Sequence, residues 1–468
     1  MRQVASSAVG RLPALFTALG LAHFALGVSL GAWMALRPAI IPLLRPLHEQ
    51  INPWGWLTFL ITGVTYAMLS LLLGRQPPWP WLGQLHLAAA EVALWTLLAG
   101  DVGATPALVA AGLAMQALAA LLFLANLLAT LLFGARLDRE ALAAAASREL
   151  AREAERRARA AARGRRPLAR PAPWIHLLTR SELARETDPV GRRGTELALL
   201  ALLAALAWQL RPLVRGLAPA APYVTPPAGA LLLRYGWVAG TLLAVPLHLL
   251  PRWLAYPAVR RRGGELAQLL WLLGLALAAV GSALGNWALA GAGSRLLGLA
   301  LLEAAALYLA PGRRLRRLGP PLAFAWRAGW LFAALLGLGL LLGLDPLSPL
   351  ATHLALLGWA TTLAYGVGYA LFPLFLGRRP RAAGISLLQL GLAVLGAVLM
   401  AAGLGALEAG PWGRLLPGRG LLAAGGSLAA AAALLYVLLW PFGRAREPAP
   451  TAPPSPEGEQ PLPGTGRA

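Results

Sequence analysis

The 468-residue chain contains no cysteine and no lysine, and only 13% of its residues are charged. Without cysteine there can be no disulfide, no thiolate metal site and no haem attached through a CxxCH motif. With so few charges and 58% hydrophobic residues, the chain lacks the polar surface that a soluble domain of this size needs. The alternation typical of transmembrane β-strands is also missing. The predicted fold class is therefore an all-α integral membrane protein.

The sequence consists largely of long apolar runs. A helix that spans a bilayer needs about 20 apolar residues, and the sequence predicts twelve such spans. They lie at about 9–36, 54–74, 82–100, 104–134, 196–217, 226–252, 264–284, 293–311, 320–343, 350–376, 382–408 and 419–442. The first run is too long for a signal-peptide core, so we expect it to be a retained helix.

The placement of the arginines predicts the orientation in the membrane. The net charge is +22, but the arginines lie between apolar runs, so we expect the lipid bilayer as partner and no nucleic acid. Segment 135–195 contains fifteen arginines, and 258–264, 312–320 and 377–382 are also basic. With twelve spans, all four segments and both termini fall on one side. The positive-inside rule makes this the cytoplasmic side of a bacterial-type cytoplasmic (inner) membrane.

A Gly-Trp pair recurs in the second, sixth and tenth predicted helices. These pairs are Gly55-Trp56, Gly236-Trp237 and Gly358-Trp359. In the second and tenth helices another glycine and a tyrosine follow at the same offsets, eight and eleven residues after the glycine of the pair. Because the pairs are about four helices apart, the pattern indicates three sets of four helices arranged around a pseudo-threefold axis.

This repeat divides the chain into five units. Residues 1–134 form the first four-helix membrane repeat, 196–311 the second and 312–442 the third. Between the first two lies a cytoplasmic Arg-rich amphipathic helical insertion, 135–195, which either anchors at the anionic membrane surface or docks a partner. The Pro-rich cytoplasmic tail, 443–468, is predicted to be disordered.

Two of the six histidines, His48 and His353, agree in position. Each lies at the outer end of a predicted helix, seven and five residues before the glycine of its Gly-Trp pair. At a rise of ~1.5 Å per residue, their depths differ by only about 3 Å. Neutral imidazole is a good axial ligand for haem iron. Two imidazoles at one depth on facing helices can therefore hold a haem from both sides.

Other interpretations of these histidines stay open. A histidine in a membrane helix can also bond to a neighbouring helix or lie at the interface. Zinc and copper sites usually have three or more ligands, so haem iron is the metal that we expect at His48 and His353. A six-coordinate iron of this kind transfers electrons and leaves no position for oxygen.

Three stretches resemble subunit I of the haem-copper oxidases, most closely the C-type (cbb-type) enzymes. RPLH at 45–48 resembles the start of their second helix, and THLALLGW at 352–359 resembles their tenth. YGWVAG at 235–240 resembles an altered form of their sixth helix. Twelve helices in three groups of four also match that fold. The resemblance implies that His48 and His353 are the axial ligands of one low-spin b haem.

The same resemblance implies that the oxygen-reducing centre is lost. The histidine that would hold a high-spin haem is replaced by Ala351, and the copper ligand of the sixth helix is replaced by Trp237. The seventh predicted helix, within 263–287, contains no histidine and no tyrosine. We therefore expect no copper, no catalytic residue and no oxygen reduction, despite the likeness to cytochrome c oxidase subunit I.

Three functions follow from this resemblance as hypotheses. The first is electron transfer in a respiratory chain, with quinol or a cytochrome or cupredoxin as redox partner and other membrane subunits beside it. The second is a haem membrane protein of the NnrS type, linked to the nitric oxide response. The third is a transporter or scaffold that kept the fold without haem, against which the missing cluster of midplane charges argues.

Two details bear on the haem hypothesis. Pro53 either kinks the second helix or begins it, and in the second case His48 lies on a loop. Arg45, Trp412 and Arg414 are candidates for binding haem propionates on the outer side; ordinary interfacial anchoring is the alternative.

Overall fold

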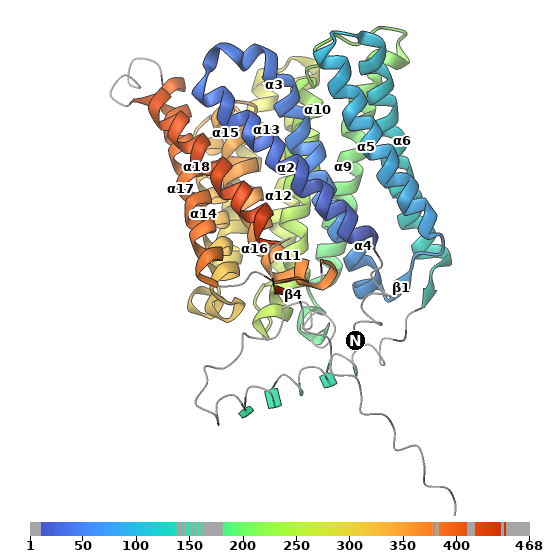
Figure 1. Ribbon diagram of the computed structural model, residues 1–468, viewed down its shortest axis with the longest axis vertical. Helices are drawn as coiled ribbons and strands as arrows, with labels where there is room; N and C mark the ends of the chain where they lie inside the picture. The colour runs from blue at the N-terminus through green and yellow to red at the C-terminus, as the bar shows by residue number, and fades with distance from the viewer. Residues whose placement is uncertain are drawn as a thin grey trace, which may run out of the picture.

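The structure is a computed structural model of an all-α protein, drawn as a bundle of long helices in Figure 1. It describes residues 11–136, 181–376, 378–379, 383–409, 417–440 and 444–445, together with single positions between 138 and 162. Most of the predicted insertion 135–195 therefore lies outside the described residues, as do 446–468 of the predicted disordered tail.

Eighteen helical segments form the bundle in the described part of the chain, and several join end to end into one helix. In chain order they are α2 (Leu12–Leu36), α3 (Ile41–Gln50), η2 (Ile51–Thr58), α4 (Phe59–Leu73), α5 (Pro80–Val102), α6 (Pro106–Phe133), α9 (Asp188–Val214), α10 (Pro227–Leu231), η4 (Leu232–Val238), α11 (Ala239–Leu254), α12 (Arg261–Leu284), α13 (Trp287–Leu309), α14 (Pro320–Leu341), α15 (Pro349–His353), η6 (Leu354–Thr361), α16 (Thr362–Phe375), α17 (Ala383–Glu408) and α18 (Gly418–Leu439). Short 3₁₀ turns, η1 (Pro38–Ile40), η3 (Ser181–Ala184) and η5 (Gly312–Leu318), lie in the connections.

Eleven helices in the described residues are long and apolar enough to cross a membrane. This confirms the predicted all-α, multi-pass membrane character. The second predicted span is not among the eleven, although α3, η2 and α4 run on as one helix from Ile41 to Leu73. The fifth predicted span begins earlier than expected, because α9 starts at Asp188, inside the predicted insertion.

Two short antiparallel ribbons lie at the end of the bundle where the N-terminus is marked in Figure 1. β1 (Arg75–Gln76) pairs with β2 (Ala135–Arg136), and β3 (Arg378–Arg379) pairs with β4 (Arg444–Ala445). β4 falls at the start of the predicted disordered tail, most of which lies outside the described residues.

The helices that carry the Gly-Trp pairs form the interior of the bundle. In the spans Pro227–Leu254 and Pro349–Pro373, 78% of the apolar window is buried, against 33–50% in the other nine spans. The middle of the second helix is buried as well, since Ile51 and Trp56 are each 1% exposed. A helix that is apolar on every side suits either a protein core or lipid, so it is their burial that places these helices in the interior.

Each of these three interior helices contains a π-helical segment at its Gly-Trp pair, namely η2, η4 and η6. Such wide turns are rare and concentrate at functional sites. Pro53 lies within η2, and the helix continues through it. His48 therefore belongs to a helix that begins at Ile41, and the alternative of His48 on a loop is wrong.

Tryptophan side chains join the three interior helices to one another. Trp237 Nε1 donates to Thr58 Oγ1 at 3.2 Å, and Trp56 Nε1 donates to Thr361 Oγ1 at 3.3 Å. Because buried donors need partners, these bonds fix η2 against both η4 and η6. This contact brings the second and tenth helices side by side, and with them the two histidines.

Candidate functional site

His48 and His353 lie together at the end of the bundle opposite the two ribbons. Their ring centroids are 6.3 Å apart, and the ring planes differ by only 18°. They come from α3 and α15, which are separated by about 300 residues in the sequence. Both side chains are half-buried. The sequence predicted that these two imidazoles converge, and the structure brings them to the same place.

Helix α2 holds the ring of His48. His48 Nδ1 lies 2.9 Å from the carbonyl oxygen of Gly27, which can only accept, so Nδ1 carries the proton and donates. Asn52 Nδ2 donates to the carbonyl oxygen of His48 at 2.9 Å. A methyl group on Gly31 would come within 2.7 Å of His48 Cε1. Glycine at position 31 therefore leaves the space that the imidazole occupies.

The first turn of its own helix holds the ring of His353. His353 Nδ1 donates to the carbonyl oxygen of Pro349 at 2.8 Å, and Ser348 caps this turn by accepting from the backbone N–H of Ala351. Once Nδ1 carries the proton, Nε2 keeps its lone pair, and this tautomer suits a metal ligand. Both histidines therefore share one arrangement, with Nδ1 bonded to backbone and Nε2 left for another partner.

The chemistry open to this pair is limited by what surrounds it. No group of three or more histidine, aspartate or glutamate side chains that could hold a metal ion occurs among the described residues. Zinc and copper sites usually need such a group.

The positions that would carry oxygen chemistry in the resembled family are occupied by other side chains. Trp237 is 2% exposed and donates to Thr58. Ala351 is fully buried. Helix α12 presents a tryptophan, Trp271, whose Nε1 donates to the carbonyl oxygen of Tyr235 at 2.6 Å. Tightly packed indoles therefore fill this part of the interior.

One cation beside the histidines was missed by the sequence analysis. Arg234 in η4 donates from Nη1 to Thr352 Oγ1 at 2.8 Å, one residue before His353. Within the described part of the chain, no ion pair to Arg234 is present. In the sequence, Arg234 is a lone charge inside an apolar run, and such a charge usually marks a functional position.

The outer arginines named from the sequence have different surroundings. Arg45 Nε pairs with Glu49 Oε1 at 2.7 Å and is 63% exposed, so it extends from α3 into the surroundings. Trp412 and Arg414 lie outside the described residues.

Three other histidines form polar contacts that no sequence pattern predicted. In the middle of α2, His23 Nε2 lies 3.5 Å from Glu91 Oε2, which also accepts from Trp95 Nε1. His86 bonds to Tyr66. Near the ribbon end, His248 Nδ1 and the guanidinium of Arg252 both contact Asp188. Their partners come from other helices, and sequence spacing does not predict such contacts.

Comparisons with known proteins add no family to this geometry. A scan against protein-family models finds no match, and a search of curated proteins finds no significant match. The likeness to the haem-copper oxidases therefore depends on the quoted residues, and the functional argument depends on the two imidazoles.

Proposed function

We propose that the protein binds one low-spin b haem between His48 and His353 and transfers electrons without reducing oxygen. The observation that carries this proposal is the pair of nearly parallel imidazoles whose centroids are 6.3 Å apart. Each ring also has its Nδ1 fixed by a backbone carbonyl, which orients it and leaves Nε2 as the ligand atom.

The spacing of the rings agrees with a shared iron. Two metal–imidazole bonds of ~2 Å, with each ring centroid ~1 Å behind its nitrogen, give a centroid separation of about 6 Å. This spacing supports a shared iron, and haem bound there would supply a one-electron couple.

The chain's own residues would hold and tune this group. The hydrogen bonds from His48 Nδ1 to Gly27 and from His353 Nδ1 to Pro349 raise the basicity of the opposite nitrogens. Arg234, which lacks a described carboxylate partner, and Arg45 are the cations nearest to the pair and suit haem propionates through charge-assisted bonds. An iron held by both histidines would have no position left for oxygen.

The architecture that we propose is twelve helices in three sets of four, like subunit I of the haem-copper oxidases. Supporting it, the three Gly-Trp helices are interior and each has a π-helical segment at the same place. By the positive-inside rule, the ribbon end with its basic connections is cytoplasmic in a bacterial-type inner membrane. The haem would then lie near the outer face, within reach of quinol or of a cytochrome or cupredoxin.

The test is an absorption spectrum of the purified protein after expression with excess haem. The wild type is expected to show the sharp α band of a reduced low-spin b haem. His48→Ala and His353→Ala should each abolish it, whereas the matched control His248→Gln should keep it. A colourless wild type, with folded protein by circular dichroism, would overturn the proposal in favour of a scaffold or transporter.

A further inference from the structure

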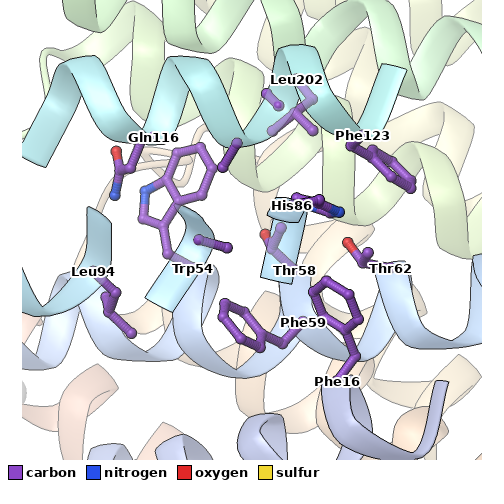
Figure 2. A pocket seen from close by; sticks show the side chains of 13 residues that line it. Phe16, Trp54, Thr58, Phe59, Thr62, His86, Leu94, Gln116, Phe123 and Leu202 are labelled. Carbon is purple, nitrogen blue, oxygen red and sulfur yellow. The ribbon is translucent and has the colours of Figure 1, made fainter. Parts of the chain in front are cut away.

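A cavity of about 40 Å³ lies among α2, α4 with η2, α5, α6 and α9, away from the histidine pair. It is shown in Figure 2. Its walls are lined by Phe16, Trp54, Thr58, Phe59, Thr62, His86, Ala90, Leu94, Gln116, Ala119, Ala120, Phe123 and Leu202. His86 is the one lining side chain with an imidazole, a group that can both take up and release a proton.

The lining residues form stripes along three helices. On the second helix Trp54, Thr58 and Thr62 are spaced by four residues, as are His86, Ala90 and Leu94 on α5. Residues four apart share one helix face. Eight residues at ~1.5 Å each give the cavity a length of about 12 Å. Its polar groups gather at both ends, with Trp54 and Gln116 at one and His86 with the threonines at the other (Figure 2).

Two buried atoms on the cavity wall lack a hydrogen-bond partner. Trp54 Nε1 is a donor on a side chain that is 7% exposed, and Gln116 Oε1 is an acceptor on one that is 6% exposed. In a membrane interior, an unpaired donor or acceptor carries its full desolvation penalty. A donor and an acceptor facing one small cavity are the partners that water binds best.

His86 offers a third polar atom from the other end. Its Nδ1 lies 2.9 Å from the hydroxyl of Tyr66, which also accepts from Asn126 Nδ2 at 3.2 Å. Across the described residues, Nε2 has no hydrogen bond, so it is free to bind a partner in the cavity that His86 lines. The ring is otherwise packed by Phe16 and Phe123, with centroids 5.0 and 5.2 Å away. When Nδ1 carries the proton and donates to the Tyr66 oxygen, Nε2 keeps its lone pair and can take up a second proton.

We infer that this cavity is an internal water site whose waters deliver a proton to His86. The cavity volume of about 40 Å³ holds about three waters, since each water molecule needs ~10–15 Å³. Three waters in a row make four hydrogen bonds of ~2.8 Å, about 11 Å in all, which matches the length of the cavity. In the transfer, a hydronium O–H bond breaks as the Nε2–H bond forms. The products are a neutral water and the His86 imidazolium. The reverse step returns the proton to water and leaves neutral His86.

The presence of water is tested by X-ray hydroxyl-radical footprinting of the full chain in nanodiscs, read by mass spectrometry. Trp54 should be oxidised at least fivefold faster than Trp271, which is also buried, at 2% exposed against 7% for Trp54, but has its Nε1 bonded to Tyr235. Gln116→Leu should remove most of this excess. The control Gln209→Leu changes another buried glutamine, which does not line the cavity, and should leave the oxidation of Trp54 unchanged. Equal rates for Trp54 and Trp271, or no effect of Gln116→Leu, would overturn the water site.

Proton delivery has its own readout in solid-state NMR. The ¹⁵N resonance of His86 Nε2, assigned by its loss in His86→Phe, should exchange with water protons in the wild type. Exchange should slow at least tenfold in Gln116→Leu and remain in Gln209→Leu. A His86 Nε2 that does not exchange in the wild type would contradict the proton role.

Discussion

At the residue scale, the geometry of the histidine pair depends on two glycines of α2. A methyl group on Gly27 would lie 2.5 Å from Asn52 Oδ1, and one on Gly31 would lie 2.7 Å from His48 Cε1. The atom in the way at Gly31 belongs to the far end of a side chain, so the imidazole can move while the helices stay in place. The site is therefore sensitive to a change that the fold tolerates.

This gives a prediction for Gly31→Ala. The added methyl should push the His48 ring off its position, so haem binding should weaken by at least tenfold while helical content and expression stay close to wild type. Gly391→Ala in α17 is the matched control, because a methyl there meets nothing within 4 Å. Haem titration followed by absorbance measures both. Wild-type affinity in Gly31→Ala would contradict the placement of His48.

At the element scale, the ribbon end of the bundle is fastened by an ion pair between two helices. Arg252 of α11 is 4% exposed at its side chain and bonds both carboxylate oxygens of Asp188, the first residue of α9. His248 adds a third bond to the same carboxylate. A largely buried arginine whose carboxylate is removed keeps an uncompensated charge, which is more costly than losing an exposed pair.

We therefore expect Asp188→Asn to lower the free energy of unfolding by about 2–3 kcal/mol. Glu196→Gln, which removes the exposed partner of Arg192 on the same helix, should change it by less than about 1 kcal/mol. Equilibrium unfolding in mixed micelles compares the two variants. Similar small effects for both would show that the buried pair contributes no more than the exposed one.

Elements were predictable to different degrees, for physical reasons. Long apolar runs revealed the peripheral helices because lipid requires about 20 apolar residues of each. The start of α3 at Ile41 was not predicted, since the second span was placed at about 54–74, and both Pro42 and Pro46 lie within that helix. The π-helical segments left no signal, since they arise where packed helices demand an extra residue per turn.

The candidate site was more predictable than its surroundings. The similar depths of His48 and His353, and their similar distances from a Gly-Trp pair, were enough to predict that the two side chains lie together. The surroundings of the pair were not predictable, because they depend on which helix faces which. Examples are the contact of His48 with Gly27, the position of Arg234 beside His353, and the pairing of His86 with Tyr66. That arrangement is a property of the packed bundle, and no spacing along the chain contains it.

At the scale of the whole molecule, the described part of the chain has most of its basic connections at one end. The ribbons include Arg75, Arg136, Arg378 and Arg444, and the 3₁₀ turn Gly312–Leu318 has four more arginines. An arginine cluster at one face of a membrane protein favours the cytoplasmic side. The histidine pair is at the opposite end, so orientation decides which compartment a redox partner would come from.

Orientation can be tested directly because the native chain contains no cysteine. Arg313→Cys at the basic end should react with a membrane-impermeant maleimide only after cells are permeabilised. Ala218→Cys, an exposed position in the connection at the other end, should react in intact cells. The reverse pattern would place the histidine pair on the cytoplasmic side.

All conclusions about function depend on one claim, that His48 and His353 hold a single haem iron. Low-temperature EPR of the oxidised, haem-loaded protein tests this claim most directly. Because the ring planes differ by only 18°, we expect a low-spin signal with three resolved g features, as near-parallel imidazoles give. His48→Ala and His353→Ala should each convert it to a high-spin signal or remove it. A low-spin signal that persists unchanged in both variants, or a wild type without any haem signal, would contradict the account.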